Sequence, residues 1–435
     1  MNKQLSANKP NSTTETIEKS LTKRHRKEAR LKYYGLFSIL LGLTFLVILL
    51  GSISMNGYTA LQQTVVSIKI KVASDKIFDD NGQISDDVMY STNWDGIAKK
   101  AFRQHFPDIR ERLEKRKLSD LISSNAGYDI QQLLLKNPDY VNREMEIWIK
   151  TSDDVDQFIK GRMTTNIPED QRRLNDKQLT WIKDLIDKNL IKKEFNSTFF
   201  TSADSREPES AGILGSILGS AMAMIITIVL ALPFAVMSAV YLEYFAKPGK
   251  MTDFIEVNIN NLAAVPSIVF GLLGLAVFLN FFELPRSAPL VGGLVLALMT
   301  LPTIIIASRA SIRAVPPSIR DAALGLGASK MQAALDQVLP LAFPGILTGT
   351  IIGMARAIGE TAPLLMIGMV VFLVDLPTGF SDPATALPVQ IFIWSDSAER
   401  AFYERSSLAI MILVLFLIAM NLLAVLLRKK FEKQW

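Results

Sequence analysis

Apolar residues gather in six long runs along the 435-residue chain, and polar stretches separate these runs. A transmembrane helix needs about 20 mostly apolar residues to cross a hydrocarbon layer of about 30 Å. The runs reach or approach that length, so the pattern predicts six transmembrane helices. They cover residues 34–53, 212–241, 262–282, 289–306, 343–373 and 408–427.

A long polar segment, residues 56–210, separates the first two runs and carries charges of both signs. Apolar and polar residues alternate at 65–72 and 145–150, which predicts half-buried strands, and helical spacing over 169–195 predicts a helix. A segment of this length can form a small folded domain. We therefore predict an α-helical integral membrane protein with an inserted α+β soluble domain between helices 1 and 2. The predicted parts are residues 1–33 (basic N-terminal segment), 34–55 (first helix), 56–210 (inserted domain) and 211–435 (remaining five helices).

Basic residues border several of the apolar runs and predict the orientation of the chain. They precede the first run at 23–32 and follow the last run at 428–433. Lys and Arg near the ends of membrane helices stay on the cytoplasmic side. Six helices then place both termini in the cytoplasm and residues 56–210 outside the cytoplasmic membrane. We interpret the first run as a retained anchor, because it begins only at Tyr34 and lacks a small-residue cleavage site.

The composition excludes most catalytic chemistry. The chain has no cysteine, which excludes disulfides, thiolate catalysis and cysteine-ligated metals. Its two histidines, His25 and His105, lie in highly charged stretches, so we predict no catalytic and no metal-binding residues. The basic stretch at 23–32 adjoins a membrane helix and can contact lipid headgroups, so no nucleic acid is expected as a partner.

The predicted cytoplasmic segment 315–340 carries signals for two short helices around a turn. Two serines are followed three residues later by Asp or Gln, the spacing of a capping box: Ser318 with Asp321, and Ser329 with Gln332. Gly325 and Gly327 can stop the first helix, and Pro340 is expected to close the second. The small residues near the turn can fit a groove in another protein, although a surface hairpin without a partner explains them as well.

This segment resembles the coupling loop of binding-protein-dependent ABC importer permeases. The resemblance rests on Asp321-Ala322-Ala323, Gly327 and Leu339-Pro340, with Asp321 standing where the family usually has Glu. It implies that these six residues dock on a separate ATPase subunit. The chain's own glycine-rich stretch, 325–331, lacks the P-loop spacing. We therefore expect a transport subunit that is not an enzyme and that leaves ATP binding to its partner.

Three further motifs, 266–272, 315–318 and 356–365, resemble the phosphate permeases of the PstA family, over about residues 205–435. The resemblance implies import of inorganic phosphate. It also implies a second, PstC-like permease subunit, a dimer of PstB-like ATPase subunits and an extracytoplasmic, PstS-like phosphate-binding protein. Residues 56–210 resemble an extra N-terminal domain of some members, whose role the resemblance leaves open.

Two charged residues, Arg356 and Glu360, interrupt the fifth apolar run. A charge at mid-bilayer costs about 2.5–3.5 kcal/mol, so it normally faces a cavity or a partner. Four residues apart, the two side chains share one helix face and can pair. Our hypothesis is that Arg356 binds the anion and that Glu360 orients the Arg356 side chain. Both residues then line the substrate pathway together with Thr361. An ion pair that only locks helix packing is the alternative.

Other functions fit parts of the pattern. An ABC importer of the same type could carry another oxyanion, such as sulfate, molybdate or phosphonate. A membrane sensor could combine the first helix with an extracytoplasmic ligand domain, but it would usually continue into a larger cytoplasmic domain. A membrane-embedded enzyme lacks a His cluster or a nucleophile–base pair here. A homodimeric pore is possible in principle, whereas the resemblance favours a heterodimer.

Overall fold

The computed structural model describes residues 13–73, 89, 91–164, 167–370 and 372–431, and the chain divides into two compact units, 1–55 and 56–435. Nearly all of helix α1 (Thr13–Gly57) belongs to the first unit. At about 1.5 Å per residue, its 45 residues extend for about 67 Å, more than twice the thickness of a hydrocarbon layer. Its apolar side chains from Tyr34 to Leu49 are exposed, as a lipid-facing helix requires.

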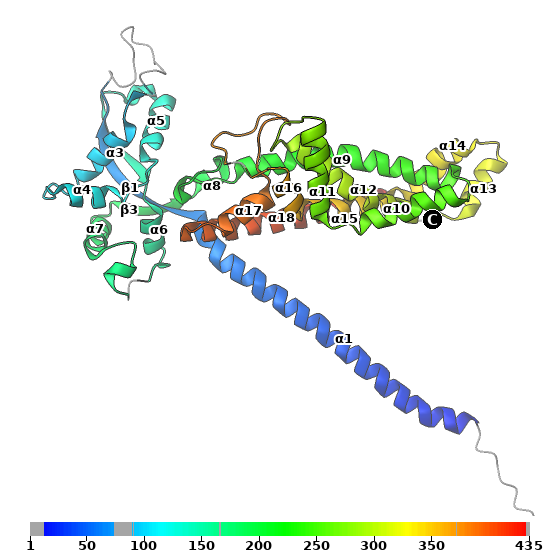
Figure 1. The fold of residues 1–435 in the computed structure, drawn as a ribbon. Coiled ribbons are helices and arrows are strands. Elements are labelled where there is room, and N and C mark those ends of the chain that lie inside the picture. The colour runs from blue at the N-terminus through cyan, green and yellow to red at the C-terminus, as the bar shows by residue number, and fades with distance from the viewer. Residues whose placement is uncertain (1–12, 74–88, 90, 165–166, 371, 432–435) are drawn as a thin grey trace, which may run out of the picture. The chain divides into compact units, whose positions relative to one another are not determined.

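The second unit begins with a three-stranded antiparallel sheet in the order β2-β1-β3. Figure 1 labels β1 and β3 of this sheet. The central strand β1 (Gln62–Lys71) lies between β2 (Glu144–Lys150) and β3 (Ile191–Phe195). Both predicted strand segments are therefore confirmed. We call residues 62–195 the sheet domain.

Helices pack around this sheet and close one hydrophobic core. They are α3 (Trp94–Arg103), α4 (Arg112–Ser119), α5 (Ala126–Lys136), α6 (Asp153–Ile159) and α7 (Asp176–Asp187). The fully buried side chains come from strands and helices alike and include Ile68, Phe102, Leu118, Ile130, Leu134, Ile149 and Ile182.

The helix predicted over 169–195 is correct only for its middle part. Helix α7 ends at Asp187, and Asn189 adopts a left-handed backbone with φ of 55°. Residues 191–195 then pair with β1 as strand β3. The apolar spacing could not reveal this change, because the strand owes its place to pairing with a distant segment.

A short helix, α8 (Ser197–Thr201), leads from the sheet domain into a bundle of helices, which we call the helical core (residues 214–431). Its longest members are α9 (Leu214–Val240), α12 (Pro289–Arg313), α15 (Leu339–Gly359) and α18 (Arg400–Phe431). Helix α12 lies between α9 and α15 and is largely buried. The small residues of α15 allow this packing: a Cβ added at Gly349 would lie 2.2 Å from Cβ of Ala307 in α12.

Shorter helices complete the helical core. They are α10 (Lys250–Ala263), α11 (Ser267–Leu273), α13 (Pro317–Gly325), α14 (Lys330–Gln332), α16 (Ala362–Met366) and α17 (Leu387–Ser395). Helices α13 and α14 lie at the end of the helical core opposite the sheet domain (Figure 1).

Among the described residues, five helices are long and apolar enough to cross a membrane: Arg24–Leu61, Leu214–Phe245, Pro289–Arg313, Lys330–Gly359 and Arg400–Lys430. The predicted number of six is reached only if a bent pair counts as one span. That pair, Lys250–Ala263 and Ser267–Phe281, is bent by 104°. The break falls at Pro266, which cannot continue the first helix.

The fifth predicted helix, 343–373, is wrong at both ends. Helix α15 ends at Gly359, because the ring of Pro363 would clash with the carbonyl of Gly359 in a continuous helix. At the other end the helical span begins at Lys330 and passes Pro340 without a break. A π-helical turn over Ala333–Val338 widens the helix before the proline. Pro340 therefore does not close the second hairpin helix, contrary to expectation.

Candidate functional site

Arg356 and Glu360 meet where α15 ends. Arg356 lies in the last turn, and Glu360 caps the helix with an extended backbone. The Nε atom of Arg356 is 3.5 Å from Oε1 of Glu360, a long contact that holds the guanidinium weakly. The Arg356 side chain is 47% exposed and that of Glu360 is 18% exposed. The two side chains thus face each other as predicted, and almost half of the Arg356 side chain remains exposed.

Helix α16 begins directly after this pair, with Thr361 at its N-cap position. It packs against α11, and the approach is close: a Cβ added at Gly271 would lie 2.7 Å from Cα of Pro363. The motifs 266–272 and 356–365, far apart in the sequence, therefore meet in space. The broken helix ends at this junction expose backbone groups that a continuous helix would use internally.

The hairpin at the far end of the helical core has the predicted turn. Helix α13 ends at Gly325, and Gly327 has a φ of +88°, a conformation that favours glycine. The capping box of Ser329 and Gln332 is confirmed. That of Ser318 is wrong, because α13 begins one residue earlier, at Pro317, without a side-chain cap.

The predicted coupling residues lie on the surface of this hairpin. Asp321 and Ala322 are exposed, Ala323 and Leu339 are partly buried, and Gly327 and Pro340 are exposed. Asp321 accepts a hydrogen bond from Nε of Arg320 at 3.0 Å. The tip also carries an apolar side chain in full contact with solvent, since Leu326 is 91% exposed. A surface of this kind suits burial against another protein.

Beside the hairpin, a charged network ties three helices together. Arg309 of α12 donates to Glu243 at 2.7 Å and to Glu256 of α10. Arg313 also donates to Glu243, at 2.8 Å. No spacing along the sequence joins these residues, because they come from separate helices.

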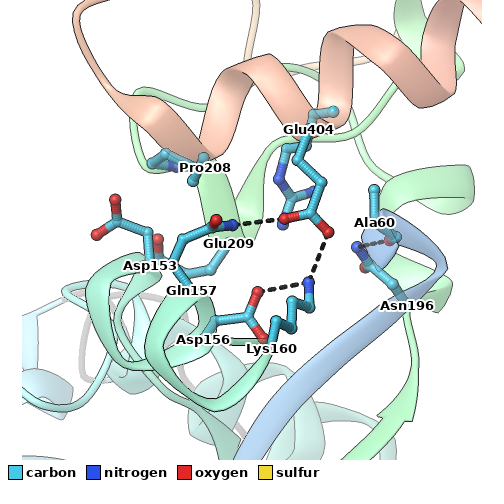
Figure 2. Close-up of a pocket in the computed structure, with 11 residues that line it drawn as sticks. Ala60, Asp153, Asp156, Gln157, Lys160, Asn196, Pro208, Glu209 and Glu404 are labelled. Atoms are coloured by element: carbon cyan, nitrogen blue, oxygen red, sulfur yellow. Dashed lines mark hydrogen bonds and ion pairs between the residues drawn. The ribbon is translucent and has the colours of Figure 1, made fainter. Parts of the chain in front are cut away.

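The sheet domain and the helical core meet at a buried charged cluster that sequence reasoning missed (Figure 2). Nζ of Lys160, the C-cap residue of α6, lies 2.6 Å from Oδ2 of Asp156 and 2.9 Å from Oε1 of Glu404 in α18. Gln157 donates to the other oxygen of Glu404. The Lys160 and Glu404 side chains are 4% and 3% exposed, so this contact is almost fully removed from solvent. We call these four residues the joint.

Neighbouring contacts extend the joint toward α9. Arg405 donates to the carbonyl of Ala211 at 2.8 Å. Glu209 lies beside it, and burial raises the pKa of its carboxyl. Its backbone carbonyl accepts from Gln63 of β1 at 2.6 Å. The start of α18 is therefore tied to the sheet domain through Glu404 and to the segment before α9 through Arg405.

Comparison with known proteins gives two family matches. Residues 18–169 match a domain of unknown function (DUF3333). Residues 210–434 match the family described as binding-protein-dependent transport system inner membrane component. The second match covers the whole helical core described above, including the hairpin.

Individual relatives agree with this match. The phosphate transport system permease protein PstA 1 of Mycobacterium tuberculosis (strain CDC 1551 / Oshkosh) is 31% identical over 222 residues, 51% of this chain and 72% of the relative. The probable ABC transporter permease protein YqgI of Bacillus subtilis (strain 168) is 33% identical over 168 residues, 38% of this chain and 56% of the relative. Among solved structures, a chain of the inward-facing MetNI methionine ABC transporter has 15% identity and a TM-score of 0.42, over 51% of this chain and 98% of that chain. The protein is a multi-pass membrane protein that belongs to the family of binding-protein-dependent transport system inner membrane components.

Proposed function

We propose that this chain is the permease subunit of an ABC transporter that imports inorganic phosphate across the cytoplasmic membrane. The observation that carries the proposal is the placement of Arg356 at a broken helix end within an apolar bundle, in a chain whose relatives include named phosphate permeases. A guanidinium can donate paired hydrogen bonds to two phosphate oxygens. Glu360 orients this cation and weakens its hold on the anion, so that phosphate can leave.

The exposed hairpin supports the proposal that a separate ATPase subunit drives transport. ATP hydrolysis takes place in a partner ATPase, which presses on Asp321, Ala322, Ala323 and the exposed Leu326 at the tip. Helix α14 continues into α15 as one helical span up to Gly359, three residues beyond Arg356. Movement of the hairpin therefore reaches the pathway along a single stiff element.

The orientation follows from the same proposal. The hairpin and both termini lie in the cytoplasm, and the sheet domain lies outside. An extracytoplasmic phosphate-binding protein delivers the anion to the outer end, and a second, PstC-like permease subunit completes the pore.

The test is uptake of labelled phosphate by the complete transporter. Arg356→Ala is expected to abolish uptake while the complex still assembles, and Arg356→Lys to retain part of it. Normal uptake by Arg356→Ala would remove this residue from the pathway. Competition by unlabelled sulfate, molybdate or phosphonate as strong as by phosphate would show that another oxyanion is the substrate.

A further inference from the structure

Three membrane helices begin or end at one level, where the chain passes between the helical core and the sheet domain. A Cβ added at Gly57, the last residue of α1, would lie 2.8 Å from the backbone N of Leu408, where the apolar run of α18 begins. Ile213, directly before α9, donates its backbone N–H to the carbonyl of Phe199 in α8 at 2.8 Å. The hydrocarbon layer is therefore expected to end near these residues.

Strand β3 reaches this level at its last residue, Phe195. This residue pairs with Gln62 of β1, which directly follows the first membrane span, ending at Leu61. Asn196 fixes the arrangement from the other side. Its backbone N–H donates to the carbonyl of Leu61 at 2.8 Å, and its side-chain amide donates to the carbonyl of Ala60 at 3.0 Å. Phe195 thus lies beside the end of a membrane span.

Aromatic rings give this place an exposed apolar surface. The Phe195 side chain is 66% exposed, and its ring stacks on that of Phe200, with centroids 5.7 Å apart and planes inclined by 4°. Phe200 packs in turn against the buried apolar cluster that joins Phe199 to the starts of α9 and α18. Tyr58, in the turn between α1 and β1, is 60% exposed. Because this surface continues from the end of a membrane span, the bilayer is the partner that adjoins it.

Polar groups of the same strand limit how deeply this surface can enter the bilayer. Strand β3 is an edge strand, and within the described residues no second strand pairs with its outer side. Hydrocarbon cannot satisfy the backbone groups of an open edge. Lys193 lies two residues before Phe195, so both side chains leave the same face of the strand. Lys193 is exposed and forms no ion pair with the described residues, whereas lipid headgroups offer it phosphate oxygens.

We propose that the surface formed by Phe195, Phe200 and Lys193, with Tyr58 beside it, lies in the phospholipid headgroup layer on the sheet domain's side of the membrane. The rings lie at the boundary between headgroups and acyl chains, the depth typical of interfacial amphipathic segments. The Lys193 ammonium donates hydrogen bonds to lipid phosphate oxygens. The bilayer then holds the sheet domain at β3, in addition to the protein contact at the joint.

The experiment measures the immersion depth of single spin labels on the full-length chain in phosphatidylcholine vesicles. The chain has no cysteine, so each introduced cysteine carries the only label. The reagents are oxygen, which concentrates in lipid, and a water-soluble nickel chelate. The ratio of oxygen to nickel collisions is expected to be about threefold or more higher at Phe195→Cys than at the control, Leu113→Cys. Leu113 is equally open to solvent, at 64% exposed, but lies on α4.

A second label leaves both rings in place. Ser197 is exposed at the start of α8, and Ser197→Cys is expected to give a ratio about twofold or more above the control. Adding Phe195→Asp is expected to lower this ratio to the control value, because the boundary excludes the charge. Tm in detergent is expected to stay unchanged, since Phe195 is largely exposed.

Three results would overturn the proposal. The first is a label at Phe195→Cys that collides with nickel as often as the label at Leu113→Cys. The second is a label there that neither reagent reaches, which would show that another protein surface covers β3. The third is an unchanged ratio at Ser197→Cys after Phe195→Asp is added. The measurement involves no phosphate transport, so its outcome is independent of the proposed function.

Discussion

Lys160 of the sheet domain and Glu404 of α18 form an ion pair of 2.9 Å, although 244 residues separate them in sequence. Both side chains are almost completely buried, and Asp156 and Gln157 complete the contact. The sheet domain is thus fixed to the start of the last membrane helix. It cannot be regarded as an appendage between the first two helices.

Removing one partner of this pair is expected to be costly. Glu404→Gln leaves the Lys160 ammonium buried with a single carboxylate, and breaking a buried pair in this way typically costs about 3–5 kcal/mol. Thermal unfolding of the full chain in detergent should show a clear drop in Tm. Lys188→Met removes an exposed i,i+4 ion pair with Asp184 and serves as the control. In this variant the free energy of unfolding is expected to change by less than about 1 kcal/mol. Equal effects of the two variants would contradict the importance of the joint.

The contact between α11 and α16 predicts a size limit at Gly271. In Gly271→Ala the added methyl group would lie 2.7 Å from Cα of Pro363, which forces the two helices apart. Overpacking of this kind costs about 1–3 kcal/mol, and phosphate uptake is expected to fall with it. Gly215→Ala is the control, because its added Cβ meets neighbours only at 3.8 Å. Wild-type uptake and Tm in Gly271→Ala would show that this junction tolerates displacement.

A substitution at the hairpin tip is expected to disrupt binding of the ATPase subunit without affecting the stability of the fold. Leu326→Asp changes a side chain that is 91% exposed, so the free energy of unfolding should change by no more than about 0.5 kcal/mol. Co-purification with the ATPase subunit should be lost, because a charge replaces the apolar contact. Leu113→Asp, at an exposed position of α4, is the matched control and should leave the complex intact. Full retention of the ATPase by Leu326→Asp would exclude the tip from the interface.

Burial, then the neighbouring Asp154, Glu209 and Glu399, raises the pKa of Asp153 to about 7, which predicts a pH-dependent stability. The folded chain holds this proton up to about pH 7, whereas the unfolded chain releases it near 3.8. Between these values folding binds a proton, so stability decreases as the pH rises from about 4 to about 7. Asp153→Asn should make this decrease in Tm shallower. An unchanged slope in the variant would indicate that Asp153 titrates normally in the folded chain.

Sequence patterns predicted those parts of the fold that depend on neighbouring residues. The apolar runs located four membrane helices, Arg24–Leu61, Leu214–Phe245, Pro289–Arg313 and Arg400–Lys430, but missed the bend in the third span and both ends of the fifth. Alternation located β1 and β2, and Ser329 with Gln332 predicted a helix start that the structure contains. The pairing of Arg356 with Glu360 followed from their spacing on one helix face.

The remaining features depend on contacts between distant segments. Strand β3 forms because residues 191–195 reach an open edge of β1, and local spacing alone favoured a helix there. The joint combines residues at the end of α6 with Glu404 of α18. Nothing in either segment by itself distinguishes these charges from ordinary surface charges, so only the folded arrangement reveals them.

The order of synthesis gives the joint one further consequence. Lys160 leaves the ribosome long before Glu404, so the nascent sheet domain must keep this ammonium hydrated until the final helix arrives. A product truncated before residue 404 would therefore expose an unfinished, charged surface.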